Sequence, residues 1–151
     1  MSDHAKKIGE KLNDLLEKNY DAEKGYKKAA ENAKDPKIKD IFNKRVSERY
    51  RFGHEIKTEL KKLDVEPDKG GSTIGSVHRT WIDVKNAFSS DNDESMLEEA
   101  ITGEEAALED YKEALGDTDY PMPAETAKVL TQQKIAIELE LNKIKQLEEF
   151  K

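Results

Sequence analysis

Residues 4–34 read HAKKIGEKLNDLLEKNYDAEKGYKKAAENAK. Apolar and small residues recur in this stretch at alternating steps of three and four, a spacing that places them on one face of an α-helix. They are Ile8, Leu12, Leu15, Ala22, Tyr26, Ala29 and Ala33. The stretch therefore predicts a long amphipathic helix with that face turned toward a core.

The same spacing returns further along the chain. Asp35-Pro36 ends the first helix and starts the next, because the residue before proline is pushed out of the α region, Asp is a good N-cap and Pro suits the first helical position. The predicted core helices lie near residues 4–34, 36–64, 93–116 and 123–150, with a connecting helix near 73–89. A bundle of two hairpins joined by one long crossover is the ferritin-like arrangement. We therefore expect one all-α domain over residues 1–151, a ferritin-like four-helix bundle with a helical crossover.

A set of large apolar residues on these helices is expected to fill the core. The set is Leu12, Leu15, Tyr26, Phe42, Phe52, Ile56, Leu97, Leu108, Leu130, Ile137 and Ile144.

Composition excludes several classes of function. The 151 residues are 39% charged, with a net charge of −7 and no cysteine, so disulfides and thiolate metal sites are excluded. Lysine and arginine are spread along every segment, which argues against a nucleic-acid partner. No apolar run approaches the ~20 residues that span a bilayer, and the N-terminal residues lack the apolar core of a secretory signal. We expect a cytoplasmic protein with no membrane partner.

Three short stretches carry a resemblance to a known family: AEKGY at 22–26, VHRTW at 77–81 and GEE at 103–105. On these, the chain resembles over nearly its full length the small bacterial ferritin-like proteins of the stress-associated group related to the YciE/YciF proteins. It departs from them at residues 141–144, where LNKI stands in place of the usual His-Asp-x-Ile. The resemblance implies a ferritin-like fold and a stress-associated role. It implies no reaction, because that family has no settled activity.

The histidines argue against a full di-iron site. Ferritin-like proteins that use metal place one Glu on each of two helices and a Glu-x-x-His pair on each of the other two. The chain has three histidines, His4, His54 and His78, and the residues three before the last two are Arg51 and Gly75. The sequence therefore contains no Glu-x-x-His pair.

Polar residues nevertheless interrupt the apolar stripes at one level of the predicted bundle. Helical projection places Arg45, Arg49, Glu104 and Gln133 near the middle of apolar faces, with Glu23 and Glu48 toward an edge. One interpretation is a buried network in which the two arginines compensate Glu23 and Glu104, with Arg49 the main partner of Glu104. The other is a carboxylate site for iron or another divalent metal, built from Glu23, Glu48 and Glu104, alone or with Gln133. An arginine repels a metal cation while satisfying the same carboxylates, which favours the network.

Three functions are compatible with these observations. The favoured one is a non-enzymatic, stress-associated structural or interaction protein with no catalytic residue, no cofactor and no metal ligand. The second is a carboxylate-rich, metal-binding relative of ferritin. The third is a helical adaptor that binds a protein partner in an apolar groove beside the connecting helix. The sequence leaves homo-oligomerisation open.

Overall fold

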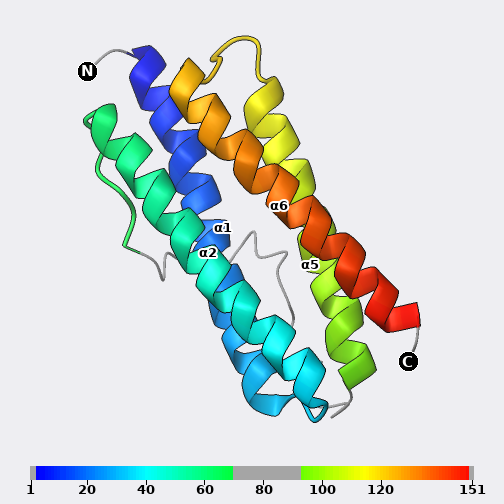
Figure 1. Ribbon diagram of the computed structural model, residues 1–151. Helices are drawn as coiled ribbons and strands as arrows, with labels where there is room; N and C mark the ends of the chain where they lie inside the picture. Colours follow the sequence, from blue (N-terminus) through cyan, green and yellow to red (C-terminus); the bar gives the residue numbers. More distant parts are fainter. Residues whose placement is uncertain (1–2, 70–92, 150–151) are drawn as a thin grey trace.

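The computed structural model describes residues 3–69 and 93–149, which form four α-helices and contain no strand (Figure 1). The helices are α1 (Asp3–Asn32), α2 (Pro36–Lys62), α5 (Asp93–Gly116) and α6 (Ala124–Glu149). The predicted all-helical, four-helix architecture is confirmed for this part of the chain. The connecting helix predicted near 73–89, and the adaptor groove beside it, lie outside the described residues.

The start of α2 follows the predicted chemistry. Asp35 is its N-cap, with a carboxylate oxygen that accepts a hydrogen bond from the Lys37 N–H at 2.8 Å, and Pro36 is the first helical residue.

The end of α2 comes two residues earlier than predicted. Asp64 adopts a left-handed backbone conformation with φ 58°, and the Val65 N–H donates to the Leu60 carbonyl at 3.0 Å. The Asp64 N–H donates to the Lys61 carbonyl at 3.0 Å. This pattern satisfies the last carbonyls of a helix and reverses the chain, so the helix stops at Lys62.

The chain beyond α2 folds back along α1. The Asn13 amide donates to the Glu66 carbonyl at 3.2 Å and accepts from the Asp68 N–H at 2.8 Å. Val65 packs over Gly9, where an added Cβ would lie 2.7 Å from the valine Cγ2. Only glycine therefore permits this close approach between α1 and the returning chain.

A carboxylate fixes the start of α5 against the first hairpin. Asp93 accepts hydrogen bonds from the backbone N–H groups of Lys34 at 2.9 Å and Asp35 at 2.8 Å. These two groups belong to the α1–α2 turn, and α1 ends at Asn32 instead of residue 34 as predicted. The turn is thus held by a residue from the second half of the chain.

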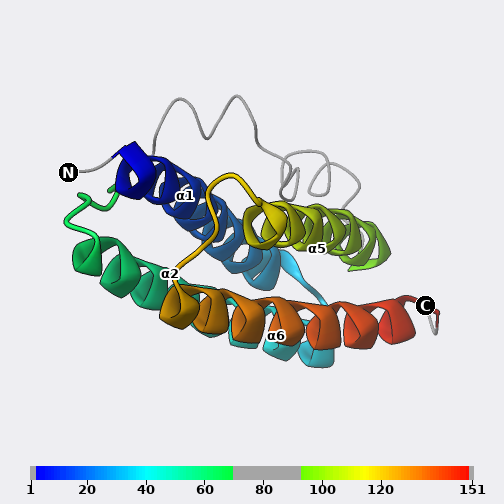
Figure 2. The ribbon, with the colours of Figure 1, turned by 90° about the horizontal axis from the view of Figure 1, so that it is seen from above.

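The four helices form two antiparallel hairpins that pack side by side. Figure 2 shows α1 beside α5 and α2 beside α6, in agreement with the contacts between these elements. Helices α2 and α5 therefore lie on a diagonal of the bundle. No helix in the described part of the chain is both long and apolar enough to cross a membrane.

The core consists of two apolar clusters, one toward each end of the bundle. One contains Tyr26, Phe42 and Leu97, and the other contains Leu12 and Phe52 among its members. Every residue predicted for the core is buried, so that prediction is confirmed. Polar side chains lie between the clusters along the chain, at Asn19, Arg45, Arg49 and Glu104.

Candidate functional site: a buried polar layer

Arg49 of α2 and Glu104 of α5 meet at the centre of the bundle. Their side chains are 1% and 0% exposed, and the arginine Nη2 donates to the glutamate Oε1. The other terminal nitrogen, Nη1, donates to the Asn19 Oδ1 on α1 at 2.8 Å. One guanidinium thus connects three helices and spans the diagonal between the two hairpins.

The hydrogen bonds continue from Asn19 to the fourth helix. The Asn19 Nδ2 donates to the Tyr111 hydroxyl at 3.0 Å, and that hydroxyl donates to the Gln133 Oε1 at 2.6 Å. The Gln133 Nε2 donates to the Glu55 Oε1 at 2.9 Å. A continuous chain of hydrogen bonds therefore leads from the buried Glu104 to Glu55, whose side chain is 37% exposed.

Arg45 has different partners from those predicted. Its Nη1 donates to the Glu48 Oε1 at 2.7 Å and lies 3.2 Å from the Glu140 Oε2 of α6. Arg45 therefore compensates Glu48 and Glu140. The guanidinium sits on the α6 side of α2, where these two half-buried carboxylates are within reach.

Glu23 does not join the polar layer, so its expected pairing with an arginine is wrong. It is half-buried, and within the described residues it makes no ion pair with Arg45 or Arg49. Its position at the edge of the apolar face of α1 turns it toward a surface pocket of about 290 Å³ between α1 and α2. That pocket is also lined by Tyr20, Lys24, Tyr50, Gly53, His54, Lys57 and Lys69.

Burial controls the ionisation of the central residues. Desolvation raises the pKa of Glu104, although the positive charge of Arg49 lowers it in part. Desolvation acts to lower the pKa of Arg49, but the charge and hydrogen bond of Glu104, together with Tyr111 and Tyr26, outweigh it and the pKa is raised. Arg49 thus stays a cation, and Glu104 depends on it for its negative charge. The Glu104 Oε2 has no hydrogen-bond partner among the described residues.

The two buried tyrosines remain protonated at neutral pH. Desolvation raises the pKa of Tyr111 to about 12 and raises that of Tyr26 well above its usual value, with the Glu104 charge adding to the shift for Tyr26. Tyr111 is therefore a hydrogen-bond donor to Gln133 and an acceptor from Asn19.

The residues present do not fit a ferritin-type metal centre. Such a centre needs several carboxylate or imidazole atoms that converge on one point. Among the described residues, Glu23, Glu48 and Glu104 form no group with ligand atoms within 4.8 Å of one another. Glu48 and Glu104 each face a guanidinium instead.

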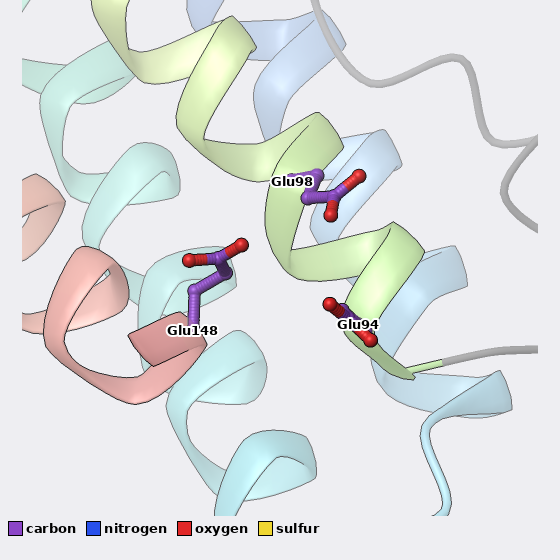
Figure 3. A group of neighbouring side chains, drawn as sticks. All are labelled: Glu94, Glu98 and Glu148. Atoms are coloured by element: carbon purple, nitrogen blue, oxygen red, sulfur yellow. The ribbon is translucent and has the colours of Figure 1, made fainter. Parts of the chain in front are cut away.

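One acidic group with that spacing lies elsewhere in the described chain, on the surface. It comprises Glu94 and Glu98 of α5 and Glu148 of α6, which face one another across the end of the bundle (Figure 3). The first two are exposed and the third is half-buried. Exposed carboxylates at this spacing are readily solvated, and nothing else about these three points to a bound ion.

A further buried carboxylate, not predicted from the sequence, lies on α2. Glu59 of α2 is 3% exposed, accepts from the Thr126 hydroxyl at 2.8 Å and receives the Lys62 ammonium at 3.1 Å. The spacing in the sequence does indicate that Glu59 is buried. Glu59 follows Ile56 by three residues and precedes Leu60, so it lies on the apolar stripe of α2.

The chain matches a known protein family over most of its length. A family model described as "Domain of unknown function (DUF2383)" matches residues 7–117. The matched part includes nearly all of α1 and the whole of α2 and α5, with Asn19, Arg45, Arg49 and Glu104, and it ends before α6. No curated protein matches the chain.

Proposed function

The chain belongs to the DUF2383 family, a family of unknown function, and from that premise we propose that it is a non-enzymatic structural or interaction protein whose buried polar layer is completed by arginine. We also propose, on the resemblance at residues 22–26, 77–81 and 103–105, that the bundle is ferritin-like and acts in the cytoplasm under stress.

The observation that carries the proposal is the buried pair of Arg49 and Glu104. A carboxylate at the centre of a helical bundle needs a positive partner, because an isolated buried charge is strongly destabilising. Arg49 supplies that partner as a permanent cation. Its second hydrogen bond, to Asn19, fixes the guanidinium in place.

The surrounding charges support the same proposal. Arg45 lies between Glu48 and Glu140, whose side chains are 16% and 15% exposed. The layer therefore contains two permanent cations, Arg45 and Arg49, beside the carboxylates of Glu48, Glu104 and Glu140. A divalent ion placed among them would face repulsion from both guanidinium groups.

Metal content is the measurement that tests this proposal. The protein is purified without chelator, incubated with Fe²⁺ or Zn²⁺ and passed through gel filtration, after which bound metal and oxidation of Fe²⁺ are measured. We expect no stoichiometric metal, no catalysed oxidation of Fe²⁺, and the same thermal unfolding midpoint with and without EDTA.

Two variants separate the central layer from the surface carboxylates. Glu104→Gln removes the buried carboxylate of α5, and Glu98→Gln is the control for weak binding at the surface group. One or two tightly bound ions per chain that are lost in Glu104→Gln and retained in Glu98→Gln would overturn the proposal and favour the metal-binding alternative. Metal lost only in Glu98→Gln leaves the central layer metal-free, as proposed.

A further inference from the structure

Helix α6 presents an uncharged stripe to solvent. Its members recur at steps of three and four, and all are exposed. They are Gln132, Ile135, Leu139, Asn142 and Gln146, here named the outer stripe. Ile135 and Leu139 are 50% and 58% exposed, which places them among the three most exposed large hydrophobic residues that the structure describes.

The outer stripe is unusual in this protein. The chain is 39% charged, yet this stripe carries no charge from residue 132 to residue 146, a length of about 21 Å along a helix. Ile135 lies about 200° around the helix from Ile137, which is fully buried. Packing within the chain therefore does not explain the outer stripe, and exposed apolar surface of this kind marks interaction sites.

We propose that the outer stripe is a self-association surface, on which α6 of a second copy of this chain packs antiparallel. A twofold axis near residue 137 places Ile135 of each copy opposite Leu139 of the other. The same axis places Gln132 opposite Asn142. The same twofold axis thus places aliphatic side chains against aliphatic side chains and amide side chains against amide side chains, as an isologous interface requires.

Charge supports a second copy as the occupant. Two copies with a net charge of −7 each repel over most of their surfaces, so an uncharged stripe is where they can approach closely. Lys134 and Glu138 lie along one edge of the stripe, and in an antiparallel pair like edges meet. Lys134 of each copy then lies near Glu138 of the other, on both sides of the axis.

The size of the surface sets the strength of association. Two half-exposed aliphatic side chains per copy offer less than the roughly 800 Å² per partner of a standard interface. The dimer is therefore concentration-dependent and dissociates on dilution. The inference is independent of the buried polar layer, because the outer stripe lies on the opposite, solvent-facing side of α6.

Sedimentation velocity over micromolar to millimolar concentrations tests the inference. For the wild-type chain we expect the dimer fraction to rise with concentration. Ile135→Lys and Leu139→Glu should each weaken association at least about tenfold, because a charge is then placed against an aliphatic group. Both positions are exposed, so both variants should keep the helical circular dichroism of the wild type.

Mixing the two variants tests the antiparallel arrangement. In an equimolar mixture the introduced lysine faces the introduced glutamate once, and Leu139 faces Ile135 once, so association should return as a heterodimer. Ser47→Glu, on the exposed face of α2, is the matched control for added charge and should associate like the wild type.

Three outcomes overturn the inference. The first is a wild-type chain that stays monomeric at millimolar concentration, which would leave the outer stripe to a different protein partner. The second is association that survives in both single variants. The third is failure of the mixture to associate, which contradicts the antiparallel pairing.

Discussion

Replacing Arg49 with methionine tests the central layer most directly. Methionine keeps much of the volume of the arginine stem but removes the charge and the hydrogen bonds to Glu104 and Asn19. Glu104, fully buried, is then left without its positive partner. We expect a large loss of stability at neutral pH that becomes smaller as the pH falls.

The magnitude follows from the ionisation of Glu104. Removing one partner of a buried ion pair costs about 3–5 kcal/mol. Glu104 can avoid being a buried, unpaired charge by taking up a proton. For a carboxyl with an unfolded pKa of 4.5, protonation at pH 7 costs about 3.4 kcal/mol. The Asn19 oxygen also loses its donor, which adds about 1 kcal/mol. The expected loss in the free energy of unfolding is therefore about 4 kcal/mol.

The pH dependence has a definite sign. In the variant the folded pKa of Glu104 lies further above its unfolded value than in the wild type, because Arg49 no longer offsets desolvation. A group whose pKa is raised on folding contributes to the free energy of unfolding. That contribution is fully present below the unfolded pKa and is lost as the pH rises through the folded pKa. Between pH 7 and pH 5 the deficit of the variant should shrink by up to about 2.7 kcal/mol.

Urea denaturation followed by circular dichroism at pH 5, 6 and 7 measures these differences. Arg51→Met is the matched control, because Arg51 is 61% exposed and its charge lies at the surface, in an i,i+4 ion pair of 3.7 Å with Glu55 and a cation–π contact with the Phe52 ring. Its replacement should change stability by at most about 0.5 kcal/mol. A loss below about 1 kcal/mol for Arg49→Met, or a deficit that is constant with pH, would refute the reasoning. If Arg49→Met does not fold, the double variant Arg49→Met, Glu104→Gln still tests it, since removing both charges should restore folding.

Other substitutions test the rest of the fold. Phe52→Ala should cost about 3–5 kcal/mol in urea denaturation, since Phe52 is 1% exposed in an apolar cluster. Asp93→Ala should cost about 1–2 kcal/mol and speed amide exchange at Lys34 and Asp35, because it removes both acceptors of those N–H groups. Asp64→Gly should raise the free energy of unfolding by about 0.5–1 kcal/mol, because glycine adopts φ 58° without strain; a thermal midpoint at or below that of the wild type would contradict this.

Periodicity and position along the hairpins were sufficient to predict the Arg49–Glu104 contact. Both residues occupy the centre of an apolar stripe, where a side chain has no route to solvent, so two opposite charges at similar depth must meet. The core residues followed from the same spacing. The four helices also followed, because proline and acidic caps end helices through local chemistry.

The partners of Glu23 and Arg45 could not be obtained in the same way. Both expectations relied on helical projection, which gives the face of a helix but not the direction of a long side chain. A residue at the edge of a stripe can turn toward the core or toward solvent, and Glu23 turns to the surface pocket. Arg45 reaches Glu140 on α6, a contact that depends on how the two hairpins are placed relative to each other.

The polar layer explains how one relative position of the hairpins is selected. Apolar contacts are non-directional, so the two core clusters would tolerate a shift of one hairpin along the other. A shift by one helical turn, 5.4 Å, would break the hydrogen bonds from Arg49 to Glu104 and from Asn19 to Tyr111, and would place a charge among apolar side chains.

The double variant Arg49→Met, Glu104→Gln should therefore recover stability without recovering a fixed register between the two hairpins. Its free energy of unfolding should recover much of the loss in Arg49→Met, because no buried charge is left alone. Its register is no longer fixed by a charged pair across the diagonal of the bundle, so we expect broadened amide resonances on α2 and α5 relative to the wild type. Ser47→Glu again serves as the control with unchanged core. Sharp, wild-type-like resonances together with full recovery of stability would show that the apolar clusters alone fix the register, and that the arginine has another role.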